Sequence, residues 1–230
     1  MNSVKVTRFA NDPPQSPYCP IWDYCIAEKK TDIDVEELAK VILLKEIEIK
    51  EQYPANNRTL NYDDGDTGLG LDSLTARFNY FNVLEWDSPV CQELRKEIKL
   101  FHAEYTKNTI GDLSNHQFFK EGGELKVRCW ANVLRRGQMI KKHFHSYHPH
   151  CYLSGHFTVQ CDDTSTVYYH PYHSGSYPFK NTPNSMTLFP TWVPHSTDKH
   201  ESDVPRITIA FDILLYNTPN QDSGGVLVTL

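Results

Sequence analysis

The chain lacks the features that mark a membrane or secreted protein. None of its apolar runs approaches the roughly 18 residues that a membrane-spanning helix needs, and its first residues, MNSVKVTRFANDPPQ, lack the apolar stretch of a signal peptide. Its six cysteines include no C-x-x-C pair, so we expect free thiols in a reducing compartment. These absences predict a cytoplasmic protein that makes no membrane contact.

An excess of basic residues is also missing. The 230 residues include 23 Lys and Arg against 29 Asp and Glu, which gives a formal net charge of −6. Electrostatic binding of nucleic acid needs a clustered basic surface, so we expect no nucleic-acid partner. Aromatic residues make up 12% of the chain, which argues against intrinsic disorder. A chain of this length can bury a core without disulfide or metal staples.

The first 115 residues have the pattern of helices and loops. Four prolines between residues 13 and 20 indicate an irregular lead-in over residues 1–30. A helix is predicted from Asp34, a capping residue, to about Glu51, and a second from Ser88 to about Tyr105, because apolar residues recur at helical spacing in both. Turn formers over residues 54–72 predict a loop. The apolar stripes suit packing on the rest of the domain, and they equally suit a homo-oligomer.

After Gly122-Gly123, short apolar segments alternate with turn residues. Many short strands separated by turns favour a closed or sandwiched antiparallel architecture such as a jelly roll, with the N-terminal helices on one outer face. The tail is expected to be a flexible arm or a late edge strand. The predicted strands are Leu125–Leu134, Tyr152–Gln160, Thr166–His170, Ser185–Phe189 and Arg206–Leu215.

Histidine is the residue whose distribution points to a function. Nine of the eleven histidines lie between His143 and His200, four of them in the segment HFHSYHPH (143–150). His143 and His145 are two residues apart, so in an extended segment both side chains point to the same face. They form half of a metal site, and His195, which follows a strand and a proline-bounded turn, is the natural third ligand. Imidazole binds several transition metals, so the histidines do not select the metal.

The predicted strand Arg206–Leu215 suggests a binding site for a dicarboxylic acid. Arg206 follows His195 by eleven residues, and Thr208 shares its face. A buried arginine presents a bidentate fork to a carboxylate, and a threonine hydroxyl adds a hydrogen bond. A ligand with two carboxylates would therefore chelate the metal at one end and reach the arginine at the other.

Taken together, these segments resemble the 2-oxoglutarate/Fe(II)-dependent oxygenases, and in particular a group with an H-x-H pair followed by a Leu-Ser-Gly strand. The order, spacing and residue types agree between residues 130 and 212. The first 115 residues add only a general helical pattern to the resemblance. The matching pieces are WANVLRRGQMI (130–140), HFH (143–145), YLSGHFTV (152–159), LFPTWVPH (188–195) and RITIAFD (206–212).

The resemblance implies a mainly β fold, a double-stranded β-helix of the cupin-like jelly-roll type. The catalytic core would span residues 116–217, with residues 1–115 packed on the barrel and residues 218–230 as a C-terminal tail, in a single domain overall. The ligands implied for Fe(II) are His143, His145 and His195. The residues implied for 2-oxoglutarate are Arg206 at its distal carboxylate, Thr208 beside it, and Asn132 and Tyr152 in the same pocket. The implied reaction uses O2, decarboxylates 2-oxoglutarate to succinate and hydroxylates a C–H bond of a small-molecule or amino-acid-like substrate.

Two departures from the wider superfamily leave alternatives open. The commonest ligand pattern is H-x-D/E, whereas here His145 holds the second position and changes the charge at the metal. Counting back from Leu153-Ser154-Gly155 also brings His148 and His150 near the expected place, so a ligand set that includes one of them is an alternative. Two other functions stay open: a cupin-like dioxygenase or isomerase that does not use 2-oxoglutarate, and a non-catalytic barrel with a closed, four-coordinate zinc.

Overall fold

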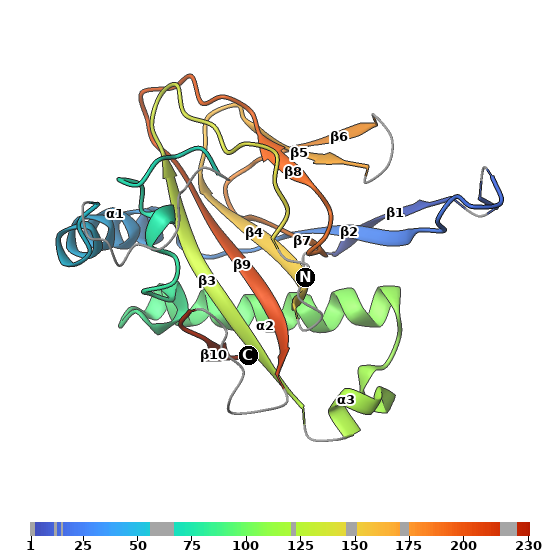
Figure 1. Ribbon diagram of the computed structural model, residues 1–230. Helices are drawn as coiled ribbons and strands as arrows, with labels where there is room; N and C mark the ends of the chain where they lie inside the picture. Colours follow the sequence, from blue (N-terminus) through green and yellow to red (C-terminus); the bar gives the residue numbers. More distant parts are fainter. Residues whose placement is uncertain are drawn as a thin grey trace.

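Two antiparallel sheets dominate the computed structural model, which describes residues 3–11, 13–14, 16–55, 67–120, 123–145, 151–170, 175–216 and 225–230 (Figure 1). Within these residues, the major sheet has the strand order β1-β2-β7-β4-β9-β3-β10 and the minor sheet the order β6-β5-β8. The strands are β1 (Lys5–Ala10), β2 (Asp23–Lys30), β3 (Glu124–Leu134), β4 (Cys151–Gln160), β5 (Ser165–Tyr169), β6 (Ser176–Lys180), β7 (Ser185–Pro190), β8 (His195–Thr197), β9 (Arg206–Tyr216) and β10 (Val228–Thr229).

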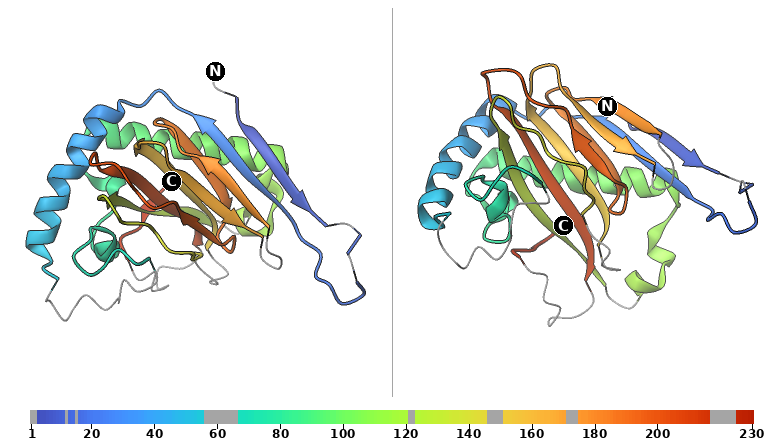
Figure 2. Two further views of the ribbon diagram at one scale, coloured as in Figure 1. Left: turned by 90° about the horizontal axis from the view of Figure 1, so that it is seen from above. Right: turned by 45° about the horizontal axis from the view of Figure 1, so that its top comes forward.

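The chain winds back and forth between the two sheets. After β3 in the major sheet, His143 forms a bridge to His195 at the start of β8 in the minor sheet. The chain then returns to the major sheet in β4, crosses to β5 and β6, and alternates again through β7, β8 and β9. The minor sheet lies over one face of the major sheet (Figure 2). This winding is that of a double-stranded β-helix, or jelly roll, so the predicted fold class is confirmed.

Two long helices, α1 (Val35–Gln52) and α2 (Pro89–Thr109), pack on the outer face of the major sheet, with α2 crossing behind its strands (Figure 1). Asp34 caps α1 as predicted, because its Oδ1 accepts a hydrogen bond from the backbone N–H of Glu37 at 3.0 Å. The shorter elements are α3 (Gln117–Lys120) and three 3-10 turns at Thr75–Arg77, Val83–Glu85 and Leu113–Asn115. Among the described residues, we find no helix with the length and apolar character needed to cross a membrane.

The central strands carry different chemistry on their two faces, because successive residues of a strand point in opposite directions. On the outer face, Phe157 of β4 and Ile209 of β9 join the apolar cluster beneath the helices. On the inner face, towards the minor sheet, the neighbouring residues His156 and Thr208 line a cavity. The apolar core of the domain therefore lies between the helices and the sheet, and a polar interior lies between the two sheets.

The close packing around Gly155, in the centre of β4, explains why the Leu-Ser-Gly segment ends in glycine. A Cβ atom there would lie 2.3 Å from the ring of Phe211 and 2.5 Å from the backbone oxygen of Thr187. Both distances are far below van der Waals contact, so only glycine allows the three central strands to approach this closely.

The N-terminal lead-in is a correction to the sequence analysis. Residues 5–10 and 23–30, expected to be irregular, form an antiparallel hairpin, and β2 pairs with β7 to extend the major sheet. The prolines indicated a break, but they all lie in the connection between the two strands. The predicted boundaries at residues 115/116 and 217/218 stay predictions. Of the tail, Val228–Thr229 pairs with β3 as an edge strand, and residues 217–224 lie outside the described part.

Candidate metal centre and its cavity

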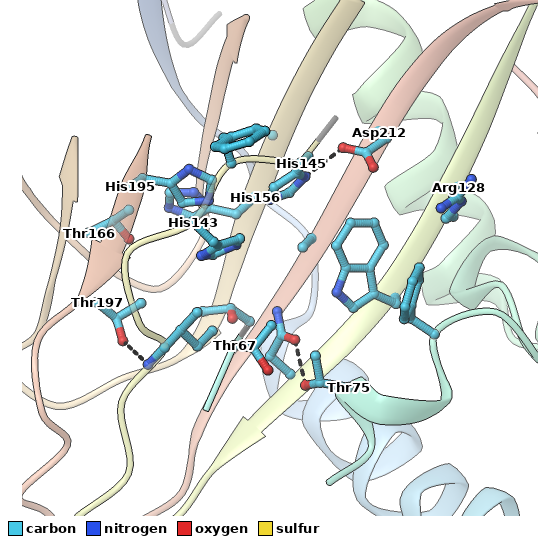
Figure 3. A pocket seen from close by; sticks show the side chains of 18 of the residues that line it. Thr67, Thr75, Arg128, His143, His145, His156, Thr166, His195, Thr197 and Asp212 are labelled. Carbon is cyan, nitrogen blue, oxygen red and sulfur yellow. Dashed lines mark hydrogen bonds and ion pairs between the residues drawn. The ribbon is translucent and has the colours of Figure 1, made fainter. Parts of the chain in front are cut away.

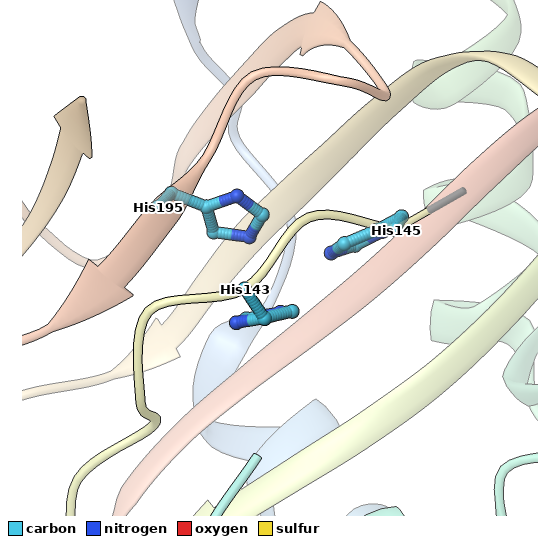
Figure 4. A group of neighbouring side chains, drawn as sticks. All are labelled: His143, His145 and His195. Carbon is cyan, nitrogen blue, oxygen red and sulfur yellow. The ribbon is translucent and has the colours of Figure 1, made fainter. Parts of the chain in front are cut away.

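Three histidine side chains converge between the two sheets. The ligand atoms of His143, His145 and His195 all lie within 4.8 Å of one another, and Figure 4 shows the three rings gathered around one space. The ring centroids of His143 and His195 are 4.4 Å apart, and those of His145 and His195 are 5.0 Å apart. Metal–imidazole bonds are about 2.1 Å long, so small side-chain rotations allow one ion to bind all three.

Backbone pairing places these histidines together. His143 and His195 exchange two hydrogen bonds, N–H to oxygen at 2.9 and 2.8 Å, and residues opposite each other in an antiparallel pair share a face. His145 is two residues further on and its N–H donates to the backbone oxygen of Thr191 at 3.1 Å. The extended segment predicted from H-x-H is therefore present, and it lies beside the strand that begins at His195.

All three rings are held with the same nitrogen towards the centre. The Nδ1 atom of His143 lies 2.8 Å from the backbone oxygen of Lys141, and that of His195 lies 3.1 Å from the oxygen of Val193. The Nδ1 atom of His145 lies 2.6 Å from a carboxylate oxygen of Asp212. Because these partners only accept hydrogen bonds, each Nδ1 carries the proton and each Nε2 keeps a lone pair for a metal.

The histidines line a cavity of about 340 Å³, near the lower end of the roughly 300–1,000 Å³ typical of small-molecule sites. Figure 3 shows the histidines on one side of it, with Thr67 and Thr75 across the space and Arg128 further along. Nine of the 21 residues that line it lie on β3, β4 and β9. The polar residues that line it on these strands are Arg128, Asn132, His156, Arg206, Thr208 and Asp212.

Arg206 gives the cavity a buried positive charge. The residue is only 1% exposed, yet its Nε and Nη1 atoms have no hydrogen-bond partner within the described part of the chain. Burial lowers the pKa of Arg206 to about 10, so the guanidinium is charged at neutral pH. An uncompensated buried charge is strongly destabilising, and the planar fork of arginine matches a carboxylate. This part of the cavity is therefore suited to an anion.

Two neutral polar side chains accompany the arginine. Thr208 is two residues along β9 on the same face, and it pairs across the sheet with Asn132 of β3. Both line the cavity. The Oδ1 atom of Asn132 accepts a hydrogen bond from the hydroxyl of Thr75 at 2.7 Å, which directs the amide nitrogen as a donor. A carboxylate held by Arg206 would meet these additional donors.

A fourth histidine, His156, lies close enough to both Arg206 and His145 to interact electrostatically with each. Its Nδ1 atom is 2.7 Å from the hydroxyl of Thr187. Burial, followed by the charge of Arg206, lowers the pKa of His156 to about 3. Burial, followed by the neighbouring His143 and His145, also pushes the pKa of His195 well below its usual range. Both rings are therefore neutral at physiological pH, the form in which imidazole binds metals.

The structure brings together six of the residues that the sequence suggested. Tyr152 is a correction: it does not line the cavity, and its hydroxyl instead forms a hydrogen bond with His102 of α2. A β-bulge between Cys151 and Leu153 shifts the register, and a shift of one residue turns a side chain to the opposite face. The alternates His148 and His150 lie outside the described residues. The six that line the cavity are Asn132, His143, His145, His195, Arg206 and Thr208.

The sequence analysis did not identify two polar residues of the site, although the spacing of both along their strands was informative. Asp212 is six residues after Arg206 in the same strand, and His156 is two residues after Ser154. Even spacing in a strand means a shared face, so both belong with residues that point inwards. Neither has a sequence neighbour that identifies its partner.

Comparison with protein-family models gives no match, and neither does comparison with curated proteins. Among solved structures, an oxidoreductase of the 2OG-Fe(II) oxygenase family from Burkholderia pseudomallei is 15% identical with a TM-score of 0.42, and the similarity covers 59% of this chain and 63% of that one. A Pseudomonas putida prolyl-4-hydroxylase is 9% identical with a TM-score of 0.48, over 82% and 91% of the two chains. A salicylate 1,2-dioxygenase from Pseudoaminobacter salicylatoxidans is 16% identical with a TM-score of 0.28, over 38% and 21%. None of these three TM-scores reaches 0.5, so the function has to be inferred from the site.

Proposed function

We propose that this protein is a non-haem oxygenase that uses Fe(II), O2 and 2-oxoglutarate to oxidise, by hydroxylation, an unactivated C–H bond. The observation that carries the proposal is that one cavity contains both three convergent histidines and a buried arginine whose Nε and Nη1 atoms have no partner in the described chain. A dicarboxylic acid would satisfy both ends, with one carboxylate on the metal and the other on Arg206.

The side chains present fit these groups. Three imidazoles with Nε2 directed inwards suit Fe(II), and the guanidinium nitrogens that have no partner among the described residues suit a carboxylate. When bound, Fe(II) would supply the O2 activation that couples oxidation of 2-oxoglutarate, to succinate and CO2, to oxidation of the substrate. The protein itself supplies positions, hydrogen bonds and exclusion of water.

Each polar residue then has a separate task in holding 2-oxoglutarate. Arg206 donates paired hydrogen bonds to the distal carboxylate, and the hydroxyl of Thr208 and the amide of Asn132 add uncharged donors on neighbouring strands. His156, which is neutral, lines the same cavity and would add no second positive charge beside Arg206. The ring centroids of Phe189 and His195 are 4.9 Å apart, so an apolar side chain lies directly beside one of the candidate ligands.

We propose a small substrate on the volume of the cavity. A volume of about 340 Å³ has to hold the co-substrate and the reacting part of the substrate, so we propose a small molecule or an amino-acid-like group. Packing on the sheet accounts for the apolar stripes of both long helices.

The proposal is tested by anaerobic visible absorbance of metal-stripped protein to which Fe(II) and then 2-oxoglutarate are added. We expect a metal-to-ligand charge-transfer band that needs both components and that is absent in His195→Ala. Arg206→Met keeps the side-chain length and removes the charge, so the apparent affinity for 2-oxoglutarate should fall by about 30-fold or more. The exposed Arg136, which pairs with Asp203 at the surface, gives the matched control Arg136→Met, with unchanged affinity.

The melting temperature separates a lost ligand from a lost fold. Because the Nε and Nη1 atoms of Arg206 are buried without a hydrogen-bond partner among the described residues, Arg206→Met should melt at or above the temperature of the wild type when no ligand is present. An unchanged 2-oxoglutarate affinity in this folded variant would overturn the proposal.

The all-histidine donor set supports a second candidate, a metal-dependent dioxygenase or isomerase that does not use 2-oxoglutarate. Such an enzyme needs no carboxylate ligand and no role for the arginine. Fe(II) binding without any band on addition of 2-oxoglutarate would favour this second function. A closed zinc site would need a fourth protein ligand, and among the described residues only three gather.

A further inference from the structure

The three histidines of the centre differ in the group that accepts their Nδ1–H. His143 and His195 donate to the backbone oxygens of Lys141 and Val193, at 2.8 and 3.1 Å. These acceptors are neutral. His145 donates to the Oδ1 atom of Asp212 at 2.6 Å, and hydrogen bonds to ionised acceptors are shorter and roughly twice as strong as neutral ones. The three candidate ligands are therefore not equivalent.

Asp212 is fixed in this role by the sheet. It lies on the inner face of β9 and pairs in register with Ser154 of β4. The Ser154 hydroxyl donates to the same Oδ1 atom at 2.6 Å, and the carboxylate side chain is 7% exposed while that of His145 is 6% exposed. Burying a carboxylate costs free energy unless hydrogen bonds or charges compensate it. The pairing of β9 with β4 therefore fixes the position of the buried Asp212 carboxylate.

The charge of the cavity shows what this carboxylate supplies. Three neutral imidazoles give a divalent ion no negative ligand, whereas a set of two histidines and one carboxylate gives it one. Asp212 is also the only acidic residue among the described residues that line the cavity. The negative charge that the three histidines lack is thus carried by Asp212, which is hydrogen-bonded to His145.

We infer that Asp212 is the positioning residue of the metal centre: through its hydrogen bond to His145 it orients that ring and supplies the negative charge that the three-histidine ligand set lacks. This inference rests on the proposed function in taking the three histidines as ligands. A carboxylate that accepts the Nδ1–H strengthens the imidazole as an electron donor to the metal, and loss of such a partner typically weakens metal binding by 10- to 100-fold. The same effect makes His145 the strongest electron donor to the metal among the three histidines.

The test measures Co(II) affinity of the metal-stripped full chain, from its visible ligand-field bands in the presence of a competing chelator. Asp212→Asn keeps the shape and an oxygen acceptor but removes the charge. We expect about 10- to 100-fold weaker Co(II) binding and shifted bands in this variant. Asp203→Asn makes the same change at an exposed carboxylate that pairs with Arg136, and its affinity should stay within twofold of the wild type.

The outcomes separate this inference from the proposal on which it rests. Wild-type protein that binds no Co(II) at all overturns the proposed function. Wild-type binding that Asp212→Asn matches within twofold overturns the inference about Asp212 alone. If the variant does not fold, proton–nitrogen NMR of the metal-free wild type decides: Nδ1–H on His145 supports the inference, and an Nε2–H tautomer overturns it.

Discussion

The two faces of the major sheet are built from the same strands but differ in composition. On the outer face, Phe157 and Ile209 are fully buried among apolar side chains of the strands and helices. On the inner face, the next residues in the chain, His156 and Thr208, line a polar cavity. The two faces are separated by one residue along the chain, so the register of each strand decides which side chains stabilise the fold and which can bind a ligand.

The difference between the faces is also energetic. Apolar burial on the outer face stabilises the domain by about 25 cal/mol per Å². The inner face contains groups that cost free energy because they have no hydrogen-bond partner among the described residues, such as the Nε and Nη1 atoms of Arg206 and the hydroxyl of Thr158. A protein tolerates such groups when they are needed for binding, so the comparison predicts opposite effects of truncation on the two faces.

The largest effect should come from the outer face. Phe157→Ala removes a fully buried ring from the centre of the apolar cluster, and such truncations lower the free energy of unfolding by about 3–5 kcal/mol. Urea unfolding measures this loss. The exposed Leu44, on α1, gives the control Leu44→Ala, which should change the free energy by less than about 0.5 kcal/mol.

Metal binding shows whether the faces can be separated. Because Phe157 points away from the cavity, folded Phe157→Ala should bind Co(II) within about twofold of the wild type. A parallel loss of metal affinity would mean that the outer core and the site form one cooperative unit.

A second prediction concerns the stability of the outer face in acid. His102 of α2 is 5% exposed, and burial lowers its pKa to about 4. Between pH 6.5 and 4 the unfolded chain binds a proton at this position and the folded chain does not, so the free energy of unfolding falls as the pH is lowered. The loss should reach roughly 2–3 kcal/mol near pH 4.5.

The variant His102→Gln removes this titration while keeping a group that can hydrogen-bond to Tyr152. The difference in unfolding free energy between wild type and variant, measured on metal-free protein, should be constant above pH 7 and change by that amount below it. His156 and His195 also have lowered pKa values, but they remain in both proteins and cancel in the difference. A difference that does not vary with pH would contradict the assignment.

The outer face was largely predictable from the sequence, because its signals are local. The stripe Val90, Leu94, Ile98, Phe101 and Tyr105 is buried along α2 as its spacing predicts, and the five predicted strands are present with ends that differ by at most one residue. The strand His195–Thr197 was missed since three residues are too few to show a period. The strands at residues 5–10 and 23–30 were missed because the four prolines between them indicate a break in regular structure.

The inner face could be predicted only in part, because its contacts join residues far apart in the chain. H-x-H and Arg206-x-Thr208 are local pairs and were recognised. The partner of His145 is Asp212, 67 positions away, and no local pattern links them. The bulge that turns Tyr152 away from the cavity depends on pairing with β9, which the spacing of Tyr152 does not reveal.

The smallest effect should come from one hydroxyl on the inner face. Thr158, next to Phe157 in the chain, is fully buried and its Oγ1 atom has no hydrogen-bond partner in the described part of the chain. Thr158→Val keeps the shape and removes an unsatisfied polar atom, so the free energy of unfolding should rise by about 1 kcal/mol. Thr166 is equally buried but donates to the Oδ1 atom of Asn181 at 3.0 Å, so Thr166→Val should lower the free energy by about the same amount.

This matched pair, with Thr158 on β4 of the major sheet and Thr166 on β5 of the minor sheet, tests whether the cost of the polar interior between the sheets lies in its unsatisfied groups or in polarity itself. Both variants exchange a buried threonine for valine, and they differ in whether the hydroxyl has a partner. If only Thr158→Val stabilises the protein, the cost belongs to groups without partners, and the same reasoning extends to Arg206, whose missing partner is then a ligand. If both variants stabilise the protein, any buried polar group is costly there, whether or not it has a partner. The guanidinium nitrogens of Arg206 that have no partner among the described residues would then no longer indicate an anion site.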